Sequence, residues 1–370
     1  MAASRTSSPS GSGEPDIAEP MRADGDGAPV RIVDLADELD LSIATVSRAL
    51  NNSAAVRPEV AERVRSLAVR RGYVANRLAR SLRSHTRSFI GFLVPDVENL
   101  AYSIAADACA TYVARSGHQL ILAISGDDAG LELQALRSLA EAQVGGLIVA
   151  PSPDMSAESR RLLRGLSVVE FNRTAGLSED MVLCDDRAAF VEATRHLLDL
   201  GHQSLAYIGT TDAVSNGRER LEGVRAELRR DGKRLLKRRT RLLPPTERDG
   251  YRAAHELLSG PDRPTAMLVG SSNLSMGVAH AVRDLGITVP DDMSLIVYGD
   301  SRWGQLYSPA LTTVTAPYAA MARSVADIVS GLVSHDDERP AGAVRLPAEL
   351  VVRASTAPPK QAAAPQNRST

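Results

Sequence analysis

A short segment near the N-terminus carries side chains that could read DNA bases. The residues from Ser42 to Asn52 predict a helix whose outward groups are hydroxyls, an amide and one arginine. Arg48 can donate two hydrogen bonds to guanine O6 and N7, a pairing worth about 1–3 kcal/mol of base discrimination. Ile43 and Ala44 stand at the helix start, where they would contact thymine methyl groups or exclude wrong bases. Phosphate contacts that hold the register are expected from Thr45, Ser47 and Asn51.

The elements before this segment must position it. An apolar stripe at i, i+3, i+4 and i+7 predicts a first helix, and its members are Ile32, Leu35, Ala36 and Leu39. Asp40 tolerates the left-handed backbone that a tight turn requires, and Ser42 is a good N-cap for the next helix. The spacing therefore predicts a helix-turn-helix, although an ordinary amphipathic helix in a small bundle would show a similar pattern.

A third helix completes this small module. We expect Val46 and Leu50 of the second helix to face inward, toward a helix that opens at Pro58 and stops at Gly72. The heptad that follows, from Asn76 to Leu82, is basic and has too few apolar positions for a core of its own.

Charge is distributed unevenly along the chain. Residues 31–87 hold 11 arginines against 6 acidic residues, a net charge of +5, whereas the remainder carries −7. A basic module on an acidic body is the electrostatic pattern of a nucleic-acid-binding protein. Leu82, at the end of the basic heptad, has two interpretations. It could be a wedge between base steps in the minor groove, or it could pack against the remainder of the protein.

The composition of the 370 residues is that of a globular protein, with 44% apolar residues. No apolar stretch reaches the roughly 18 residues of a membrane span, and the N-terminus lacks the apolar region of a signal peptide. We therefore expect a cytoplasmic, nucleoid-associated protein with no membrane partner. Residues 1–29 and 357–370 are polar and low in complexity, and we expect both to be disordered.

After Arg87 the pattern changes to alternating strands and helices. Phe89–Val94 is a continuous apolar run, typical of a strand buried on both faces of a parallel sheet. A second series of strands and helices starts near Asp185. The sequence Ser116-Gly117-His118-Gln119 has an echo in Leu200-Gly201-His202-Gln203, and each predicts a glycine helix stop that leads into a buried strand. We expect two doubly wound α/β subdomains with a ligand cleft at the carboxyl ends of their strands.

Catalytic motifs are missing from the sequence. There is no Gly-x-Ser-x-Gly elbow, no phosphate-binding Gly-x-x-x-x-Gly-Lys and no dinucleotide-binding glycine pattern. The two cysteines, Cys109 and Cys184, are far apart, and we expect both to be buried free thiols. We therefore expect no enzyme, no metal and no cofactor. A pure solute-binding protein is disfavoured because it would need an export signal.

These residues together resemble the LacI/GalR (lactose-repressor) family of bacterial transcription regulators. The resemblance covers roughly residues 30–357. In the DNA-binding part it rests on Thr45-Val46-Ser47-Arg48, Leu50-Asn51, Gly72-Tyr73 and Asn76–Leu82. In the α/β part it rests on Gly145–Ile148, Leu200-Gly201-His202, Arg218–Gly223, Asp249–Ala254, Ser308–Val314 and Ser355-Thr356.

The resemblance implies a homodimer that binds a near-palindromic operator in double-stranded DNA. It implies a hinge helix at Asn76–Leu82 that folds on DNA and inserts Leu82, and it adds Ser42, Tyr73 and Asn76 to the residues that contact DNA. It also implies a periplasmic-binding-protein-like core with a small-molecule cleft, in which Arg220 contacts the effector and Tyr102 lines the pocket. From the residues alone, Arg220 could instead be solvated or salt-bridged on a highly charged helix.

The sequence departs from the family pattern in the turn, the hinge and the cleft. Asp40 replaces the turn glycine and Ala75 the proline before the hinge. In the cleft, Ser271-Ser272 stands where Asn-Asp is common, Gly299 precedes Asp300 where an Asp-Asp pair is usual, and Ala101 replaces the first aromatic before Tyr102. We expect Tyr102, Arg220, Ser271 and Asp300 to bind the effector.

The sequence thus predicts five segments and one function. The segments are a disordered extension (1–29), a helix-turn-helix domain (30–74), a hinge helix and linker (75–87), an effector-binding and dimerisation core (88–356) and a disordered tail (357–370). The function is sequence-specific DNA binding by a regulator, most simply a repressor, controlled by a sugar or related metabolite. Because the cleft is altered, a non-sugar effector, a protein co-effector or effector-independent action remain alternatives.

Overall fold

The computed structural model describes residues 30–50, 55–73, 89–336, 338–339 and 342–360. The chain divides into two compact units, residues 1–84 (the N-terminal unit) and 85–370 (the C-terminal unit). Within the described ranges, no helix is long and apolar enough to cross a membrane.

The N-terminal unit is a three-helix module built as the apolar spacing predicts. It consists of α1 (Ile32–Leu39), α2 (Ile43–Leu50) and α3 (Pro58–Arg70). Asp40 adopts the left-handed conformation (φ 51°) between α1 and α2, and the Ser42 hydroxyl accepts a hydrogen bond from the Thr45 N–H at 3.1 Å. Both features confirm the predicted turn.

One detail of this module differs from the prediction. Val46 is buried as expected, but its inward partner on α2 is Ala49, whereas Leu50 is only partly buried. Positions 46, 49 and 50 share one face of the helix, and on this face Ala49 lies inside the core and Leu50 at its margin.

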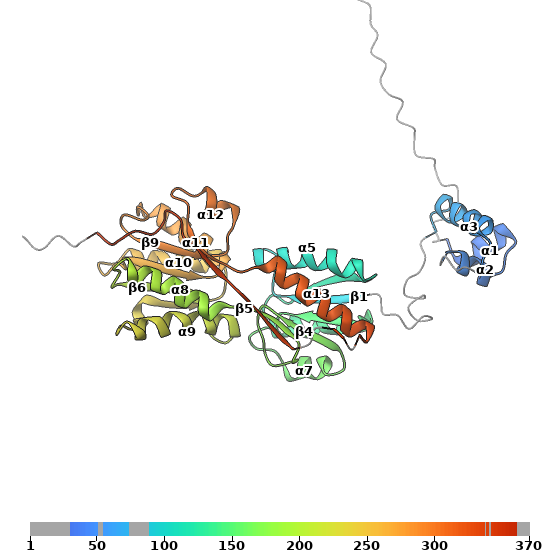
Figure 1. The fold of residues 1–370 in the computed structure, drawn as a ribbon, viewed down its shortest axis with the longest axis horizontal. Helices are drawn as coiled ribbons and strands as arrows, with labels where there is room; N and C mark the ends of the chain where they lie inside the picture. The colour runs from blue at the N-terminus through green and yellow to red at the C-terminus, as the bar shows by residue number, and fades with distance from the viewer. Residues whose placement is uncertain (1–29, 51–54, 74–88, 337, 340–341, 361–370) are drawn as a thin grey trace, which may run out of the picture. The chain divides into compact units, whose positions relative to one another are not determined.

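The C-terminal unit contains two α/β lobes (Figure 1). Lobe 1 has a sheet of parallel strands in the order β11-β5-β4-β3-β1-β2. Its strands are β1 (Phe89–Val94), β2 (Gln119–Ile124), β3 (Gly146–Val149), β4 (Ser167–Phe171), β5 (Met181–Asp185) and β11 (Ala343–Pro347). Its helices are α5 (Leu100–Arg115), α6 (Ala129–Glu141), α7 (Ala157–Leu163) and α13 (Tyr318–Ser334).

Lobe 2 repeats this plan with the order β12-β10-β9-β8-β6-β7, in which only β12 runs antiparallel to its neighbour among the described strands. Its strands are β6 (Leu205–Thr210), β7 (Thr240–Leu243), β8 (Ala266–Gly270), β9 (Ser294–Tyr298), β10 (Thr312–Thr315) and β12 (Glu349–Val351). Its helices are α8 (Asp186–Asp199), α9 (Ser215–Arg230), the 3-10 turn η1 (Lys237–Arg239), α10 (Glu247–Leu258), α11 (Ser272–Asp284) and α12 (Arg302–Leu306).

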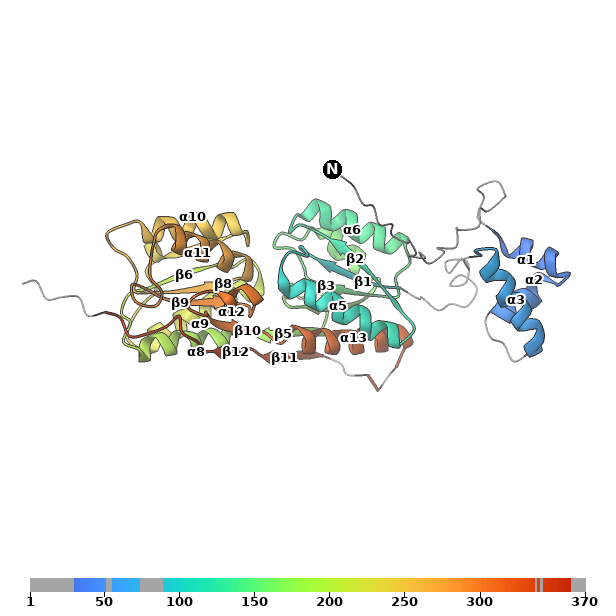
Figure 2. The same ribbon diagram turned by 90° about the horizontal axis from the view of Figure 1, so that it is seen from above.

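Helices cover both faces of each sheet, which confirms the predicted doubly wound fold. In lobe 2, α10 and α11 lie on one face and α8 and α9 on the other (Figure 2). The chain passes between the lobes three times: from β5 to α8, from β10 to α13, and from β11 to β12. The first passage is at Asp185–Asp186, where the sequence predicts the second series to start. Three connections allow the lobes to move about a hinge while remaining one unit.

The predicted echo between the two halves is wrong for β2. Both glycines stop a helix with positive φ, 79° at Gly117 and 93° at Gly201. The strand after Gly201 is β6, which is fully buried, but the strand after Gly117 is β2, which lies at the edge of its sheet and is partly exposed. In the strand order of its sheet, β6 takes the internal position that β1 takes in lobe 1. The similar sequences therefore precede two strands in different environments, β2 at an edge and β6 inside its sheet.

Both cysteines are free and buried, as the sequence predicts. Burial raises the pKa of the Cys109 thiol to about 12, and it raises the pKa of Cys184 as well. Neither thiol is therefore a thiolate near neutral pH, so these cysteines act as small apolar residues in the core.

Candidate nucleic-acid interface and ligand cleft

The outward face of α2 has the composition that the sequence predicts. Val46 and Ala49 turn into the three-helix core, which leaves the opposite side of the helix open. Ser42, Ile43, Ala44 and Arg48 are exposed, and Thr45 and Ser47 are half-buried. Ile43 is 46% exposed. An apolar group beside free polar groups suits the edge of a base pair, which presents methyl groups as well as hydrogen-bonding atoms.

Arg48 is the arginine of α2 and lies on its open face. It makes no hydrogen bond or ion pair with any described residue, whereas Arg31, Arg65 and Arg71 each pair with a carboxylate of the unit. A long cation with no internal partner can be directed at an external acceptor without breaking an interaction of the protein.

The predicted positive charge lies mainly beyond the described part of the module. Residues 31–73 hold seven arginines and six acidic residues, so the excess of +5 over residues 31–87 comes largely from the basic segment that follows. Asn51, Asn76 and Leu82, together with Ala75 and the predicted hinge helix, lie outside the described residues. Tyr73 is described, and it packs partly buried against the three-helix core.

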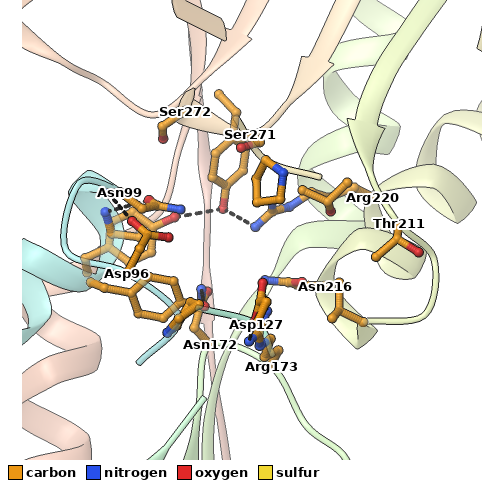
Figure 3. A pocket seen from close by; sticks show the side chains of 18 residues that line it. Asp96, Asn99, Asp127, Asn172, Arg173, Thr211, Asn216, Arg220, Ser271 and Ser272 are labelled. Atoms are coloured by element: carbon orange, nitrogen blue, oxygen red, sulfur yellow. Dashed lines mark hydrogen bonds and ion pairs between the residues drawn. The ribbon is translucent and has the colours of Figure 1, made fainter. Parts of the chain in front are cut away.

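A second candidate site lies in the C-terminal unit, between the two lobes. Its volume, with the part open to solvent included, is about 530 Å³. Figure 3 shows polar side chains of both lobes facing this space. Six of them lie within three residues after the end of a strand: Asp96 after β1, Asp127 after β2, Asn172 and Arg173 after β4, Thr211 after β6 and Ser271 after β8. This is the strand-end position predicted for a ligand in doubly wound sheets.

Lobe 1 contributes a group of polar residues to the cleft. Asn172 donates to the Tyr102 hydroxyl at 3.2 Å, and Arg173 forms a short ion pair with Asp127. Burial raises the pKa of Asp96, even though the Asn99 N–H donates to that carboxylate at 2.6 Å. The Asn172 Oδ1 and Arg173 Nε atoms are buried and have no hydrogen-bond partner among the described residues.

Lobe 2 contributes Arg220, which is only 4% exposed. Its guanidinium pairs with Asp186 at 3.0 Å, donates to the Gly270 carbonyl at 2.8 Å, and lies over the ring of Tyr298 at 3.9 Å from the centroid. Arg220 therefore forms a salt bridge within the protein, which the residues alone had left open as an alternative. It also lies in the cleft wall.

Three of the four predicted effector-binding residues lie in the cleft lining. They are Tyr102, Arg220 and Ser271, and the Ser271 hydroxyl has no hydrogen-bond partner in the part of the chain that the structure describes. Asp300 is not among the lining residues, because the chain turns at Gly299 (φ 87°) and the Asp300 carboxylate pairs with Arg353 at 2.8 Å. Several lining residues were not predicted, although their place after predicted strands was a usable signal: Asp96, Asp127, Asn172, Arg173 and Thr211.

Comparisons with known proteins agree with this arrangement. A family model described as a periplasmic binding protein-like domain matches residues 194–356. An HTH-type transcriptional regulator from the aml 5′ region of Streptomyces limosus is 30% identical over 348 residues, 91% of this chain and 97% of that protein. The chain belongs to the LacI/GalR family of transcriptional regulators.

Two further members of the family are similar over most of this regulator. The HTH-type transcriptional regulator GalR of Escherichia coli is 29% identical over 311 residues, 84% of this chain and 90% of that protein. The crystal structure of the lac repressor dimer bound to operator and the anti-inducer ONPF has a TM-score of 0.79 at 22% identity, over 89% of this chain and all of that one. The protein is thus a DNA-binding transcriptional regulator, and its relatives are regulators rather than enzymes.

Proposed function

We propose that this regulator represses transcription by binding, as a homodimer, a near-palindromic operator whose bases are read by α2. The observation that carries this proposal is the open face of α2, on which Arg48 has no partner among the described residues and Ile43 is exposed. We assign the base contacts to Ile43, Ala44 and Arg48 and the phosphate contacts to Ser42, Thr45 and Ser47. For Tyr73 we propose a supporting role, because its ring packs on the helical core.

Lobe 1 has an exposed apolar surface at the edge of its sheet. The edge strand β2 exposes Leu122 and Ile124 by 40% and 50%, and the neighbouring Leu131 of α6 is exposed by 52%. An exposed apolar sheet edge of this kind tends to associate with another protein surface. The similar lac repressor structure is a dimer, and we propose a homodimer here, with β2 and α6 at its interface.

We further propose that a small molecule in the cleft changes operator affinity. The supporting observation is the set of buried polar atoms without partners in the lining, Asn172 Oδ1, Arg173 Nε, Arg220 Nε and Ser271 Oγ. Buried polar atoms normally have hydrogen-bond partners, so a group of them around one space points to a ligand. Hydroxyl groups of a sugar or related metabolite can both donate and accept, which suits this mixture.

The experiment that tests this proposal is a selection of bound fragments from the regulator's own genomic DNA. We expect the enriched fragments to share a motif with two half-sites in inverted orientation. Their spacing should match one or more helical turns of DNA between two recognition helices. Binding should fall steeply as salt rises, because phosphate contacts release counterions. An enriched motif without two-fold symmetry would contradict the dimer, and no enrichment over input would contradict sequence-specific binding.

A further inference from the structure

The cleft wall contains a tyrosine, Tyr298, for which the sequence predicted no role. Tyr298 is the last residue of β9, and it is only 2% exposed. Gly299 follows with φ 87°, and a Cβ atom there would lie 2.4 Å from the Ser272 hydroxyl oxygen. Glycine at 299 therefore permits the sharp turn by which the chain leaves β9 beside the cleft.

The hydroxyl of Tyr298 completes the coordination of Arg220. Arg220 Nη2 donates to this oxygen at 2.9 Å, and the hydroxyl in turn donates to Asp186 Oδ1 at 2.9 Å. The Nη1 atom already donates to the Gly270 carbonyl. The two terminal nitrogens of the arginine are therefore engaged by protein atoms, and the Nε atom remains without a partner.

The same hydroxyl also links the two lobes. Tyr318 begins α13, which packs in lobe 1, and its O–H donates to the Tyr298 oxygen at 3.3 Å. Two more interactions cross from lobe to lobe. The Thr174 N–H donates to the Ser215 hydroxyl at 2.8 Å, and Arg345 forms a bidentate ion pair with Glu219 at 2.9 and 3.0 Å. These three contacts link the lobes directly.

We propose that Tyr298 is a built-in ligand of Arg220 that holds the cleft closed in the absence of an effector. Its hydroxyl occupies the Nη2 donor of Arg220 that a bound hydroxyl or carboxylate would otherwise take, and it links lobe 2 to Tyr318 of lobe 1. An effector that accepts a hydrogen bond from Arg220 Nη2 must displace this hydroxyl. It should therefore loosen the link between the lobes, a consequence that rests on the effector control proposed above.

Hydrogen exchange of the Thr174 amide tests this proposal directly, because that amide is protected only while the lobes are together. In the full-length protein without added ligand, we expect Thr174 to exchange slowly. Tyr298→Phe keeps the ring and removes the hydroxyl, and it should make Thr174 exchange about tenfold faster. Tyr318→Phe leaves the bonds of Arg220 intact, breaks only the link between the lobes, and should also accelerate exchange.

The matched control is Tyr307→Phe, since Tyr307 is a half-buried tyrosine of lobe 2 whose hydroxyl has no hydrogen bond within the described residues. Thr174 exchange should not change in this variant. Fast exchange of Thr174 in the wild-type protein, or unchanged exchange in Tyr298→Phe, would overturn the proposal. If Tyr298→Phe fails to fold, unchanged exchange in Tyr318→Phe would overturn it. Operator binding by the same samples is measured separately. Failure of the proposed role of Tyr298 is therefore distinguishable from failure of the proposed function.

Discussion

Arg48→Ala is expected to reduce discrimination between the operator and a site changed at one guanine by about 5- to 150-fold. A bidentate arginine–guanine pair contributes about 1–3 kcal/mol of discrimination, and 1.4 kcal/mol corresponds to a factor of ten. The exposed, unpaired Arg48 side chain can make this contact without breaking an interaction within the described residues. The measurement is a gel-shift competition between the selected operator and variants changed at each guanine.

The control for Arg48→Ala is Arg70→Ala, which removes one exposed arginine from the last turn of α3. Loss of this charge should weaken binding to all sequences equally, because it removes a contact with phosphate at most. Undiminished discrimination by the Arg48→Ala protein, with binding otherwise normal, would remove Arg48 from the base contacts and leave Ile43 and Ala44 as the candidates.

Arg220→Ala is expected to cost about 3–5 kcal/mol of the free energy of unfolding of the C-terminal unit. The substitution leaves Asp186, which is 1% exposed, as a buried carboxylate without its cation, and removing one partner of a buried ion pair has costs of this size. The Gly270 carbonyl and the Tyr298 hydroxyl also lose a donor. Denaturant unfolding of the purified protein measures the loss.

Two comparisons make the Arg220 result specific. Arg218→Ala removes an exposed arginine from the same helix and should change stability by less than about 0.5 kcal/mol. The double variant Asp186→Ala with Arg220→Ala should lose much less than the sum of the two single variants, because the two residues interact directly. A loss below about 1 kcal/mol in Arg220→Ala would show that the pair contributes little, and that the guanidinium is free to bind an effector.

Local patterns in the sequence were sufficient to predict most of the fold. Continuous apolar runs such as Phe89–Val94 are long enough to identify buried strands, and the change of lobe near Asp185 follows from the order of the elements. The strands β5, β10, β11 and β12 were not predicted. The exposed residues of β11 alternate with partly buried ones along the strand, and its partner β5 lies more than 150 residues earlier in the chain. Nothing in its own sequence indicates that pairing.

In the candidate sites, too, features set by neighbouring residues were predicted, and features set by distant residues were not. The turn at Asp40 and the cap at Ser42 depend on neighbouring residues, and both were predicted correctly. The environment of Arg220 depends on Asp186 and Tyr298, which are 34 and 78 residues away in the sequence. Such contacts are set by the packing of strands and helices from both ends of lobe 2, so only the structure shows that this arginine is already paired.

The central claim is that occupation of the cleft controls the affinity for DNA. A thermal-shift screen of sugars, nucleosides and sugar phosphates would first identify a compound that stabilises the C-terminal unit. The decisive measurement is the operator dissociation constant with and without a saturating concentration of that compound. The account predicts a change of about 5- to 150-fold, with a reciprocal change in the affinity for the compound when operator is present. A compound that binds in the cleft and leaves the operator dissociation constant unchanged would contradict it.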